Sequence, residues 1–481
     1  MTDMGRKLHI YHSFFYLLGD AFYMLHCYSL NGYHICMDVE SGAIHVLEKL
    51  PFEMLQFLQE DQMTGECPAE VISAMSDRYA DSEIRQAYEE LYGLYREGML
   101  FSKRDYEIQL ESTYPIKALC LHISHDCNLR CKYCFAEGGD FAQGRKVMPF
   151  EVAKKAIDFV IERSEKRRNI EVDFFGGEPL MNFEVVKQTV SYARSLEEST
   201  GKRFRFTLTT NGMLLTDEVM DYLNQEMSNV VLSLDGRKCV NDAVRVRVDG
   251  TGSYDKIVPK FQKFVRQRKG KDYYVRGTFT AQNLDFGKDV VHLKELGFEQ
   301  VSVEPVVLDS NHPMALKESM LEQIYAEYES LAKKMIEYKR NGDFFNFFHF
   351  MIDLQQGPCV IKRVKGCGSG SEYLAVTPDG DIYPCHRFAG MPEFRMGNVL
   401  DGTQLNETIR RQFTAATVLA KPECENCFAK YYCSGGCAAN NFNENGDILK
   451  PHKMSCELER KRIECAIMIK AAEAEMAEKD V

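Results

Sequence analysis

The 481-residue chain lacks an excess of positive charge, a long apolar run and a recognisable export signal. Its 59 basic residues are outnumbered by 71 acidic ones, and the net charge of −12 argues against nucleic-acid and membrane-surface binders, because both use a basic surface. No apolar run reaches the roughly 18 residues of a membrane span, and the N-terminal segment has no small-residue cleavage site. We therefore expect a cytoplasmic protein that has no nucleic-acid or membrane partner.

Cysteine is the unusual part of the composition, with 17 residues. In a reducing compartment, such a number is more typical of metal binding than of disulfides. Three cysteines lie at positions 127, 131 and 134, and eight more fall between 359 and 456. The other six are scattered, and we expect small buried side chains there: Cys27, Cys36, Cys67, Cys120, Cys239 and Cys465.

Residues 1–105 have the pattern of a separate binding module. Two β-rich runs surround Glu40–Gly42, which predicts a hairpin, and a helix is expected to begin near Pro51. Two amphipathic helices are expected around 68–77 and 81–96. Strands and three helices without a catalytic cluster predict a winged-helix-like module. A plain N-terminal cap on the next domain is the alternative.

Residues 116–310 alternate strand and helix patterns, which predicts an α/β fold with a parallel sheet and functional loops at the carboxyl ends of the strands. Six strand–helix units are visible, whereas a closed (β/α)₈ barrel needs eight. We therefore expect a partial (β/α)₆ barrel that is open on one side. The expected strands are Ala118–Ile123, Ile170–Phe175, Phe204–Thr209, Val230–Leu234, Tyr274–Thr280 and Gln300–Glu304.

Two segments follow the barrel. Residues 311–356 predict a helical connector, with helices around Leu321–Lys339 and Phe344–Gln356. Residues 357–481 contain the cysteine-dense region and end in a charged helix that is expected over about Glu457–Glu478. The chain is thus expected to contain a module, a barrel, a connector and a cysteine-rich domain.

The first cysteine group lies in HDCNLRCKYCFAEGGDF, directly after the first expected strand. Three thiolates can bind three irons of a [4Fe–4S] cluster, which four cysteines normally hold. An unfilled coordination position is where a small molecule can bind and react. A zinc site would need a fourth local ligand, and His125 could supply it only at an awkward two-residue spacing from Cys127.

The segment CNLRCKYC, in which Tyr133 precedes the last cysteine, resembles the signature of the radical S-adenosylmethionine (SAM) enzymes. The resemblance implies that Cys127, Cys131 and Cys134 hold the cluster and that SAM chelates its open iron. Reductive cleavage of SAM in this family gives a 5′-deoxyadenosyl radical.

Three further motifs follow the next expected strands and match the same family, namely GGEP, TTNG and SLDG. The resemblance places GGEP at the SAM amino group and the other two near its ribose and methionyl groups, with Arg245 near its carboxylate. The implied SAM-binding residues are Tyr133, Gly176, Gly177, Glu178, Pro179, Thr210, Asn211, Ser233, Asp235 and Arg245.

The downstream cysteine spacings resemble a SPASM domain, which carries auxiliary iron–sulfur clusters. The eleven cysteines of the two regions match three ligands for the SAM cluster and four for each of two auxiliary clusters. The resemblance therefore implies SAM and three [4Fe–4S] clusters as cofactors, with zinc ribbons as the alternative. The implied distal ligands are Cys424, Cys427, Cys433 and Cys456, and the implied proximal ligands are Cys367, Cys385 and Cys437.

Two positions depart from the sulfatase maturases of this group. Cys359 is the expected fourth proximal ligand, but its spacing to Cys367 differs, so one iron could instead stay open for a substrate thiolate. The residue after the YPC cysteine is His386, where those enzymes have an aspartate that is taken to be the general base. His386 is therefore either a catalytic proton carrier or a residue that packs beside the cluster.

The segments HDCNLRCKYCFAEGGDF, RVDGTGSYD and CGSGSEYLAVTPDGDIYPCHRF most resemble the maturases of SCIFF (ranthipeptide) precursors, and the resemblance runs over nearly the whole chain. These enzymes are expected to join a cysteine sulfur to an acceptor residue as a thioether. The implied partners are a short cysteine-rich precursor, whose leader the N-terminal module would capture by β-addition, and an external one-electron reductant of the flavodoxin or ferredoxin type. The alternatives are a formylglycine-forming or quinoprotein cross-linking maturase and, in another class, an electron-transfer or peptide-binding protein that does not cleave SAM.

Overall fold

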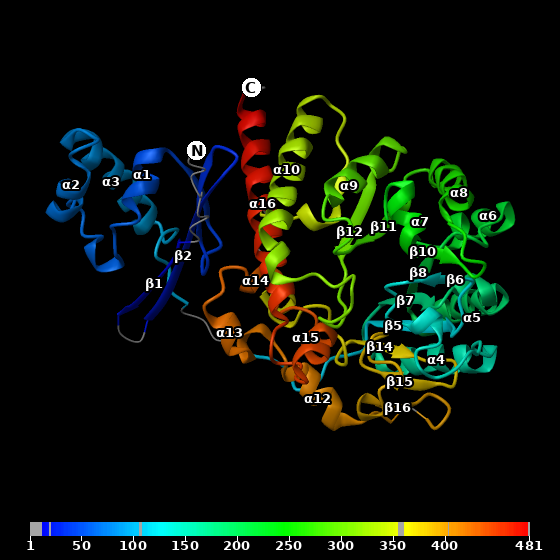
Figure 1. The fold of residues 1–481 in the computed structure, drawn as a ribbon. Coiled ribbons are helices and arrows are strands. Elements are labelled where there is room, and N and C mark those ends of the chain that lie inside the picture. The colour runs from blue at the N-terminus through cyan, green and yellow to red at the C-terminus, as the bar shows by residue number, and fades with distance from the viewer. Residues whose placement is uncertain (1–11, 19–20, 105–107, 355–359, 403, 480–481) are drawn as a thin grey trace.

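The structure is a computed structural model that describes residues 12–18, 21–104, 108–354, 360–402 and 404–479. Figure 1 shows a barrel-like body, a smaller N-terminal module and two long helices between them. None of the helices in these ranges is long and apolar enough to cross a membrane.

The N-terminal module consists of a four-stranded antiparallel sheet and three helices, with a hydrophobic core of its own. The expected hairpin is present, because β3 pairs with β4 on either side of Glu40–Gly42. The two longer strands that precede it were not expected from the sequence. The elements are β1 (His12–Leu18), β2 (Ala21–Leu30), β3 (Tyr33–Asp38), β4 (Ile44–Leu47), α1 (Lys49–Met54), α2 (Ala69–Met75) and α3 (Asp81–Arg96). The winged-helix comparison stays a prediction.

All six expected barrel strands are present and form a parallel sheet in the order β12-β11-β9-β8-β7-β5. The sheet does not close on itself, because β13 pairs with β12 at one end and β14 pairs with β5 at the other. The strands are β5 (Ala118–Ser124), β7 (Asn169–Gly176), β8 (Arg203–Thr210), β9 (Asn229–Ser233), β11 (Asp272–Phe279) and β12 (Gln300–Pro305).

Helices cover the outer face of this sheet (Figure 1). On β7, the side chains of Ile170, Val172 and Phe174 are buried beneath them, whereas Asp173 and Phe175 on the opposite face are half-buried. An open barrel leaves its inner face partly uncovered, and this creates room for a site. The helices are α4 (Phe150–Arg163), α5 (Phe183–Thr200), α6 (Asp217–Glu226), α7 (Lys238–Val244), α8 (Tyr254–Gln267) and α9 (Phe286–Glu295).

The connector is only partly helical. The first expected helix is present as α10 (Leu321–Arg340), but the second one, over Phe344–Gln356, is wrong. The segment instead forms the short strand β13 (Asn346–Phe347) and a single 3₁₀ turn at Phe348–Phe350, and its last two residues lie outside the described part. Aromatic residues fit a strand beside a sheet, and Phe347 is fully buried next to β12.

The cysteine-rich region continues the barrel sheet. Strand β14 (Tyr373–Val376) runs parallel to β5, and β15 (Asp381–Tyr383) and β16 (Gly397–Asn398) follow it in antiparallel order. The barrel and this region therefore share one ten-stranded sheet. Its helices are α11 (Val360–Lys365), α12 (Glu407–Ala415), α13 (Pro422–Glu425), α14 (Lys430–Cys433), α15 (Ala438–Asn445) and α16 (Lys453–Lys479).

The C-terminal helix α16 begins four residues earlier than expected and lies between α10 and the N-terminal sheet (Figure 1). On the N-terminal side, His26 Nε2 lies 3.0 Å from Glu464 Oε1, and the Tyr28 hydroxyl donates to the Glu464 carbonyl at 3.0 Å. On the other side, Lys461 contacts Glu329 of α10 at 2.8 Å. The helix therefore joins the module to the rest of the chain.

The module also contacts the cysteine-rich region directly. The rings of His26 and Phe428 stack with centroids 3.5 Å apart. Glu40, at the tip of the β3–β4 hairpin, pairs with Lys430 and accepts a hydrogen bond from the Tyr431 hydroxyl at 2.8 Å. These contacts fall between Cys427 and Cys433, so the module packs against the predicted ligand loop of the distal cluster.

Four of the six scattered cysteines are buried, as expected: Cys27, Cys36, Cys120 and Cys465. Cys67 is half-buried, and Cys239 on α7 is exposed. The prediction is therefore wrong for Cys239.

Candidate active site

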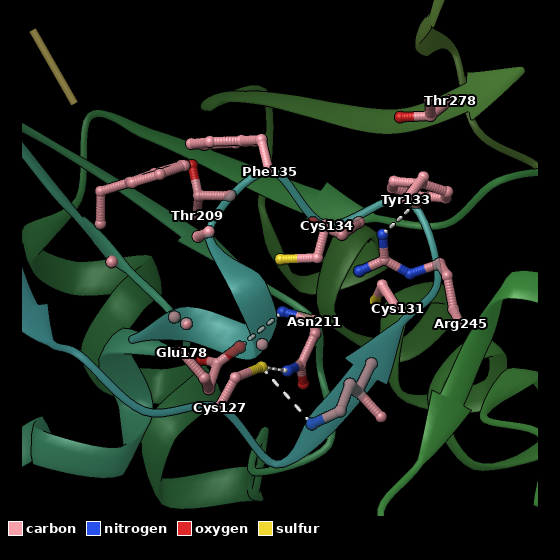
Figure 2. A pocket seen from close by; sticks show the side chains of 18 of the residues that line it. Cys127, Cys131, Tyr133, Cys134, Phe135, Glu178, Thr209, Asn211, Arg245 and Thr278 are labelled. Carbon is pink, nitrogen blue, oxygen red and sulfur yellow. Dashed lines mark hydrogen bonds between the residues drawn. The ribbon is translucent and has the colours of Figure 1, made fainter. Parts of the chain in front are cut away.

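A pocket opens at the carboxyl ends of the barrel strands, and residues that follow each of the first four strands line it together with β11 and β12. Its wall also contains His386 and Arg387 from the cysteine-rich region. Figure 2 shows the part of this pocket around the first cysteine motif. The cysteine-rich region thus contributes directly to the barrel site.

The three cysteines of the first motif, Cys127, Cys131 and Cys134, all line the pocket. Their loop is fixed by a two-stranded antiparallel sheet of β6 (Leu129–Cys131) and β10 (Arg245–Arg247), in which Cys131 lies opposite Arg245. The fold therefore brings the first motif and the distant arginine to the same place, as expected.

The cysteine thiols are buried and partly hydrogen-bonded. Burial raises the pKa of Cys127 to about 12 and that of Cys131 to about 11. The Leu129 backbone N–H and the Asn211 side-chain amide donate to Cys127 Sγ at 3.4 and 3.5 Å (Figure 2). Thiols with such high pKa values stay protonated near neutral pH. Metal coordination deprotonates a thiol outright, so bound iron would supply the positive charge that stabilises the thiolates here. The donor set fits a cluster with one open iron.

The zinc alternative is not supported by the position of His125. The ring of His125 is buried, and its Nε2 lies 3.0 Å from Nδ1 of His122. His125 also stacks on Phe141 and does not line the pocket. Across the described ranges, no three His, Cys, Asp or Glu side chains converge on a single-ion site.

Glu178 of the GGEP motif lines the pocket and joins the ends of β7 and β8. Its Oε1 accepts hydrogen bonds from the Leu180 backbone at 3.1 Å and the Thr210 hydroxyl at 2.8 Å. Its Oε2 accepts from the Asn211 backbone at 2.8 Å. Burial raises the pKa of Glu178 to about 7 despite these donors.

The two glycines of this motif allow a close backbone contact. A Cβ on Gly176, where φ is +125°, would lie 2.3 Å from the Ser124 carbonyl oxygen. A Cβ on Gly177 would lie 2.2 Å from the Asp126 carbonyl oxygen. The two glycines therefore let the backbone that leads into the cysteine loop approach the end of β7. From the sequence, we had predicted that they let the backbone approach a ligand.

Tyr133, Asp235 and Arg245 form one buried network. The Tyr133 hydroxyl donates to Asp235 Oδ2 at 2.7 Å. It accepts from Arg245 Nη1 at 2.8 Å (Figure 2). Asp235 Oδ1 accepts from the Thr278 backbone at 3.1 Å. Asp235 is fully buried and does not line the pocket, so it positions its neighbours. Arg245 does line it, and its Nε has no partner among the described residues.

Pro179, Thr210 and Ser233 also line the pocket. With Tyr133, the GGEP residues, Asn211 and Arg245, nine of the ten expected SAM-binding residues therefore lie at one site, and Asp235 is the exception.

His386 packs against two aromatic rings of the pocket, Phe175 and Phe135, with centroid distances of 4.9 and 5.8 Å. Its Nδ1 has no hydrogen-bond partner among the described residues. Burial and the neighbouring Arg387 lower the pKa of His386 to about 3. A base works best when its pKa lies near the operating pH, so this environment favours packing over proton transfer.

Five polar residues of the wall were not predicted from the sequence. Three of them lie on the last two barrel strands, namely Arg276 and Thr278 on β11 and Glu304 on β12, and the other two are Thr209 and Arg387. The three on β11 and β12 belong to the carboxyl-terminal half of their strands. A charged residue near the carboxyl end of a barrel strand is typical of an active site, and this pattern could have identified Arg276 and Glu304 from the sequence.

The thiols of the downstream cysteines neighbour one another in two groups, and their roles as cluster ligands stay predictions. Burial, Glu459 and the thiols of Cys456, Cys427 and Cys424 together raise the pKa of Cys433 to about 12. Burial also raises the pKa of Cys385 to about 12, with contributions from the thiols of Cys437 and Cys367. Cys359 lies outside the described residues.

A buried lysine lies between the two groups. Lys421 is 3% exposed, and its Nζ donates to the Gly435 carbonyl at 2.6 Å. No carboxylate pairs with it among the described residues. Burial lowers the pKa of Lys421. Four nearby thiols would favour its charged form if they were thiolates, and they belong to Cys424, Cys433, Cys437 and Cys456. A buried ammonium needs a compensating charge, so this region fits anionic iron–sulfur clusters.

Comparisons with known proteins agree with this geometry. Residues 121–275 match the radical SAM superfamily, and residues 367–428 match the SPASM iron–sulfur cluster-binding domain. The radical SAM cyclopropyl synthase TigE of Paramaledivibacter caminithermalis is 23% identical over 449 residues, which cover 89% of this chain and 91% of that protein.

A cysteine-type anaerobic sulfatase-maturating enzyme of Clostridium novyi is 24% identical over 335 residues, which cover 66% of this chain and 86% of that enzyme. The solved structure of native anSMEcpe with bound AdoMet and Cp18Cys peptide superimposes with a TM-score of 0.63, at 20% identity, over 75% of this chain and 99% of that one. The chain therefore carries a radical SAM barrel followed by a SPASM domain, and it is a radical SAM enzyme homologous to the SPASM-type maturases.

Proposed function

We propose that this enzyme forms thioether cross-links in a cysteine-rich precursor peptide. The observation that carries the proposal is the shared pocket, in which the SAM-cluster cysteines face His386, the residue next to Cys385. Cys385 belongs to the predicted proximal cluster. A substrate radical formed in this pocket would therefore lie near an auxiliary electron acceptor.

Thioether formation needs such an acceptor. The peptide gives one hydrogen atom to the 5′-deoxyadenosyl radical, and the joining of sulfur to carbon then releases one proton and one electron. Two auxiliary [4Fe–4S] clusters, for a total of three, would be held by the two cysteine groups described above, with Cys359 completing the proximal set or leaving an iron open. A flavodoxin or ferredoxin would supply the electron that starts SAM cleavage.

The chain's own residues would position SAM. Arg245 offers an unpartnered Nε to the SAM carboxylate, and Glu178 is ionisable near neutral pH beside the expected amino group. Thr210, Asn211 and Ser233 lie at the following strand ends, where the ribose and methionyl groups are expected.

The N-terminal module would recognise the precursor's leader. Strand β4 is an edge strand that pairs only with β3 within the described sheet, and Val46 on it is 53% exposed. An edge strand can capture an extended peptide through main-chain hydrogen bonds.

The proposal also includes the division of the chain into four parts, which are residues 1–105, 116–310, 311–356 and 357–481.

The test is the mass of a short cysteine-rich peptide encoded next to this chain's gene, after anaerobic reaction with SAM and a reductant. We expect a product lighter by two hydrogen atoms per cross-link, with one alkylatable thiol lost each time and no reversal by a disulfide reductant. A reversible mass change contradicts the proposal. An aldehyde at Ser or Cys would instead assign the enzyme to the formylglycine-forming class.

A further inference from the structure

Glu304 lies at the carboxyl end of β12, in the same pocket as the first cysteine motif. In the parallel sheet it is paired with Thr278 of β11, which also lines the pocket. Only two carboxylates contribute to the wall, Glu304 and Glu178. Both oxygens of Glu178 are used by protein donors, so Glu304 is the carboxylate that can serve a substrate.

The polar contacts of Glu304 centre on one oxygen. Its Oε1 lies 3.3 Å from the Ser302 hydroxyl, 3.5 Å from Arg276 Nη2 and 3.6 Å from His349 Nε2. No described residue donates a hydrogen bond to its Oε2. The side chain is 27% exposed, so Oε2 is the atom left available to the pocket.

The groups around Glu304 keep it ionised. Burial opposes ionisation, but His349, Arg276 and Arg462 outweigh it and lower the pKa of Glu304. Arg462 Nη1 donates to His349 Nδ1 at 2.8 Å, which assigns the proton of the neutral ring to Nε2, the atom that faces Glu304. The carboxylate therefore contacts groups from β11, β12 and the 3₁₀ turn, and Arg462 of α16 orients the His349 ring.

We propose that Glu304 is the catalytic residue that accepts the substrate proton during bond formation, and this rests on the proposed function. The 5′-deoxyadenosyl radical removes a hydrogen atom from the acceptor carbon and becomes 5′-deoxyadenosine. As the sulfur–carbon bond forms, the S–H bond breaks and its proton passes to Glu304 Oε2. A bound, oxidised [4Fe–4S] cluster would accept the one electron that is released. Sulfur becomes strongly acidic as it bonds to an oxidised carbon, so a carboxylate of low pKa suffices as its base.

The position of His386 agrees with this assignment. His386 packs against the rings of Phe175 and Phe135, and the SPASM residues that line the pocket include no carboxylate. Glu304 supplies a carboxylate to the same pocket from the last barrel strand.

The test compares Glu304→Gln and Glu304→Asp with wild-type enzyme on the cysteine-rich peptide encoded next to this chain's gene. The readout is the ratio of oxidised peptide to 5′-deoxyadenosine. We expect this ratio to fall by about 10²- to 10⁴-fold in Glu304→Gln, the usual contribution of a general base. Glu304→Asp should retain part of the activity, and formate should partly rescue Glu304→Gly.

The matched control is Glu299→Gln, an exposed carboxylate just before the same strand and away from the pocket, which should leave the ratio unchanged. An unchanged ratio in Glu304→Gln overturns the inference, as does a raised KM for the peptide with an unchanged kcat. If wild-type enzyme forms an aldehyde instead of a thioether, the proposed function fails. The same ratio, measured on that product, still decides the role of Glu304.

Discussion

Replacement of Cys127, Cys131 and Cys134 together by alanine is expected to abolish 5′-deoxyadenosine formation. The three thiols line the pocket with Arg245 and Glu178, and no other cysteine of the described chain lines it. We propose that these thiols hold the cluster that delivers the electron to SAM, so the variant would have no ligands for it. The variant should lose about four of roughly twelve irons per chain, at four per cubane cluster. The auxiliary cysteines lie in other parts of the fold and should keep theirs.

Iron and sulfide analysis after anaerobic reconstitution, together with chromatography of 5′-deoxyadenosine, checks this expectation. Cys239→Ala is the matched control, because Cys239 is an exposed cysteine on α7 that belongs to neither region. It should change neither the iron content nor the activity. Residual SAM cleavage by the triple variant would contradict the assignment, and iron saturating near four in the wild-type protein would contradict the auxiliary clusters.

The second large effect is expected from a single methyl group. In Gly177→Ala, the new Cβ would lie 2.2 Å from the Asp126 carbonyl oxygen and 3.0 Å from the Gly139 Cα, both of which are backbone atoms. No side-chain rotation relieves such a contact, so the cysteine loop must move away from β7. A displacement of about 1 Å at a catalytic site costs on the order of 100-fold in rate. We expect at least that loss in SAM cleavage, with the fold retained.

Gly93→Ala provides the control for the glycine substitution. Gly93 lies within α3, and a Cβ there meets no atom within 4 Å. Alanine in a helix is about 0.5–1 kcal/mol more favourable than glycine, so this variant should be as active as wild type and slightly more stable to heat. Equal SAM cleavage by the Gly177 and Gly93 variants would show that the GGEP contact does not position the cysteine loop.

The barrel was predictable because each strand carries a local signal. Apolar strand runs separated by amphipathic helices specify six parallel strands, and all six were found within two residues of the expected ends. The cysteine motifs were predictable for the same reason, since their spacing is local. The strand ends then bring the GGEP, TTNG and Arg245 segments to one pocket, as parallel topology requires.

Contacts between distant segments were not predictable. The role of Asp235 depends on Tyr133 and Thr278, which come from two other parts of the chain. The position of α16 between α10 and the N-terminal sheet follows from side-chain packing, which a periodic pattern does not encode. The aromatic run at 344–350 matched a helix by periodicity, but burial beside β12 selected a strand and a turn.

Glu304 shows the same limit at the level of the site. Its sequence context, VSVEP, is that of an ordinary buried strand. Its availability to a substrate depends on Arg276 and His349, which hold one oxygen and leave the other. Such an arrangement becomes visible only when the register of β11 and β12 and the position of α16 are known.

The central claim is that a radical formed at the first cysteine motif reacts with a peptide in the shared pocket. Its most direct test is hydrogen transfer from a cysteine-rich precursor, encoded next to this chain's gene and deuterated on carbon, into 5′-deoxyadenosine under anaerobic reducing conditions. The account predicts that 5′-deoxyadenosine gains one deuterium in step with formation of the cross-linked peptide. Unlabelled 5′-deoxyadenosine, formed while the same peptide is being modified, would contradict it.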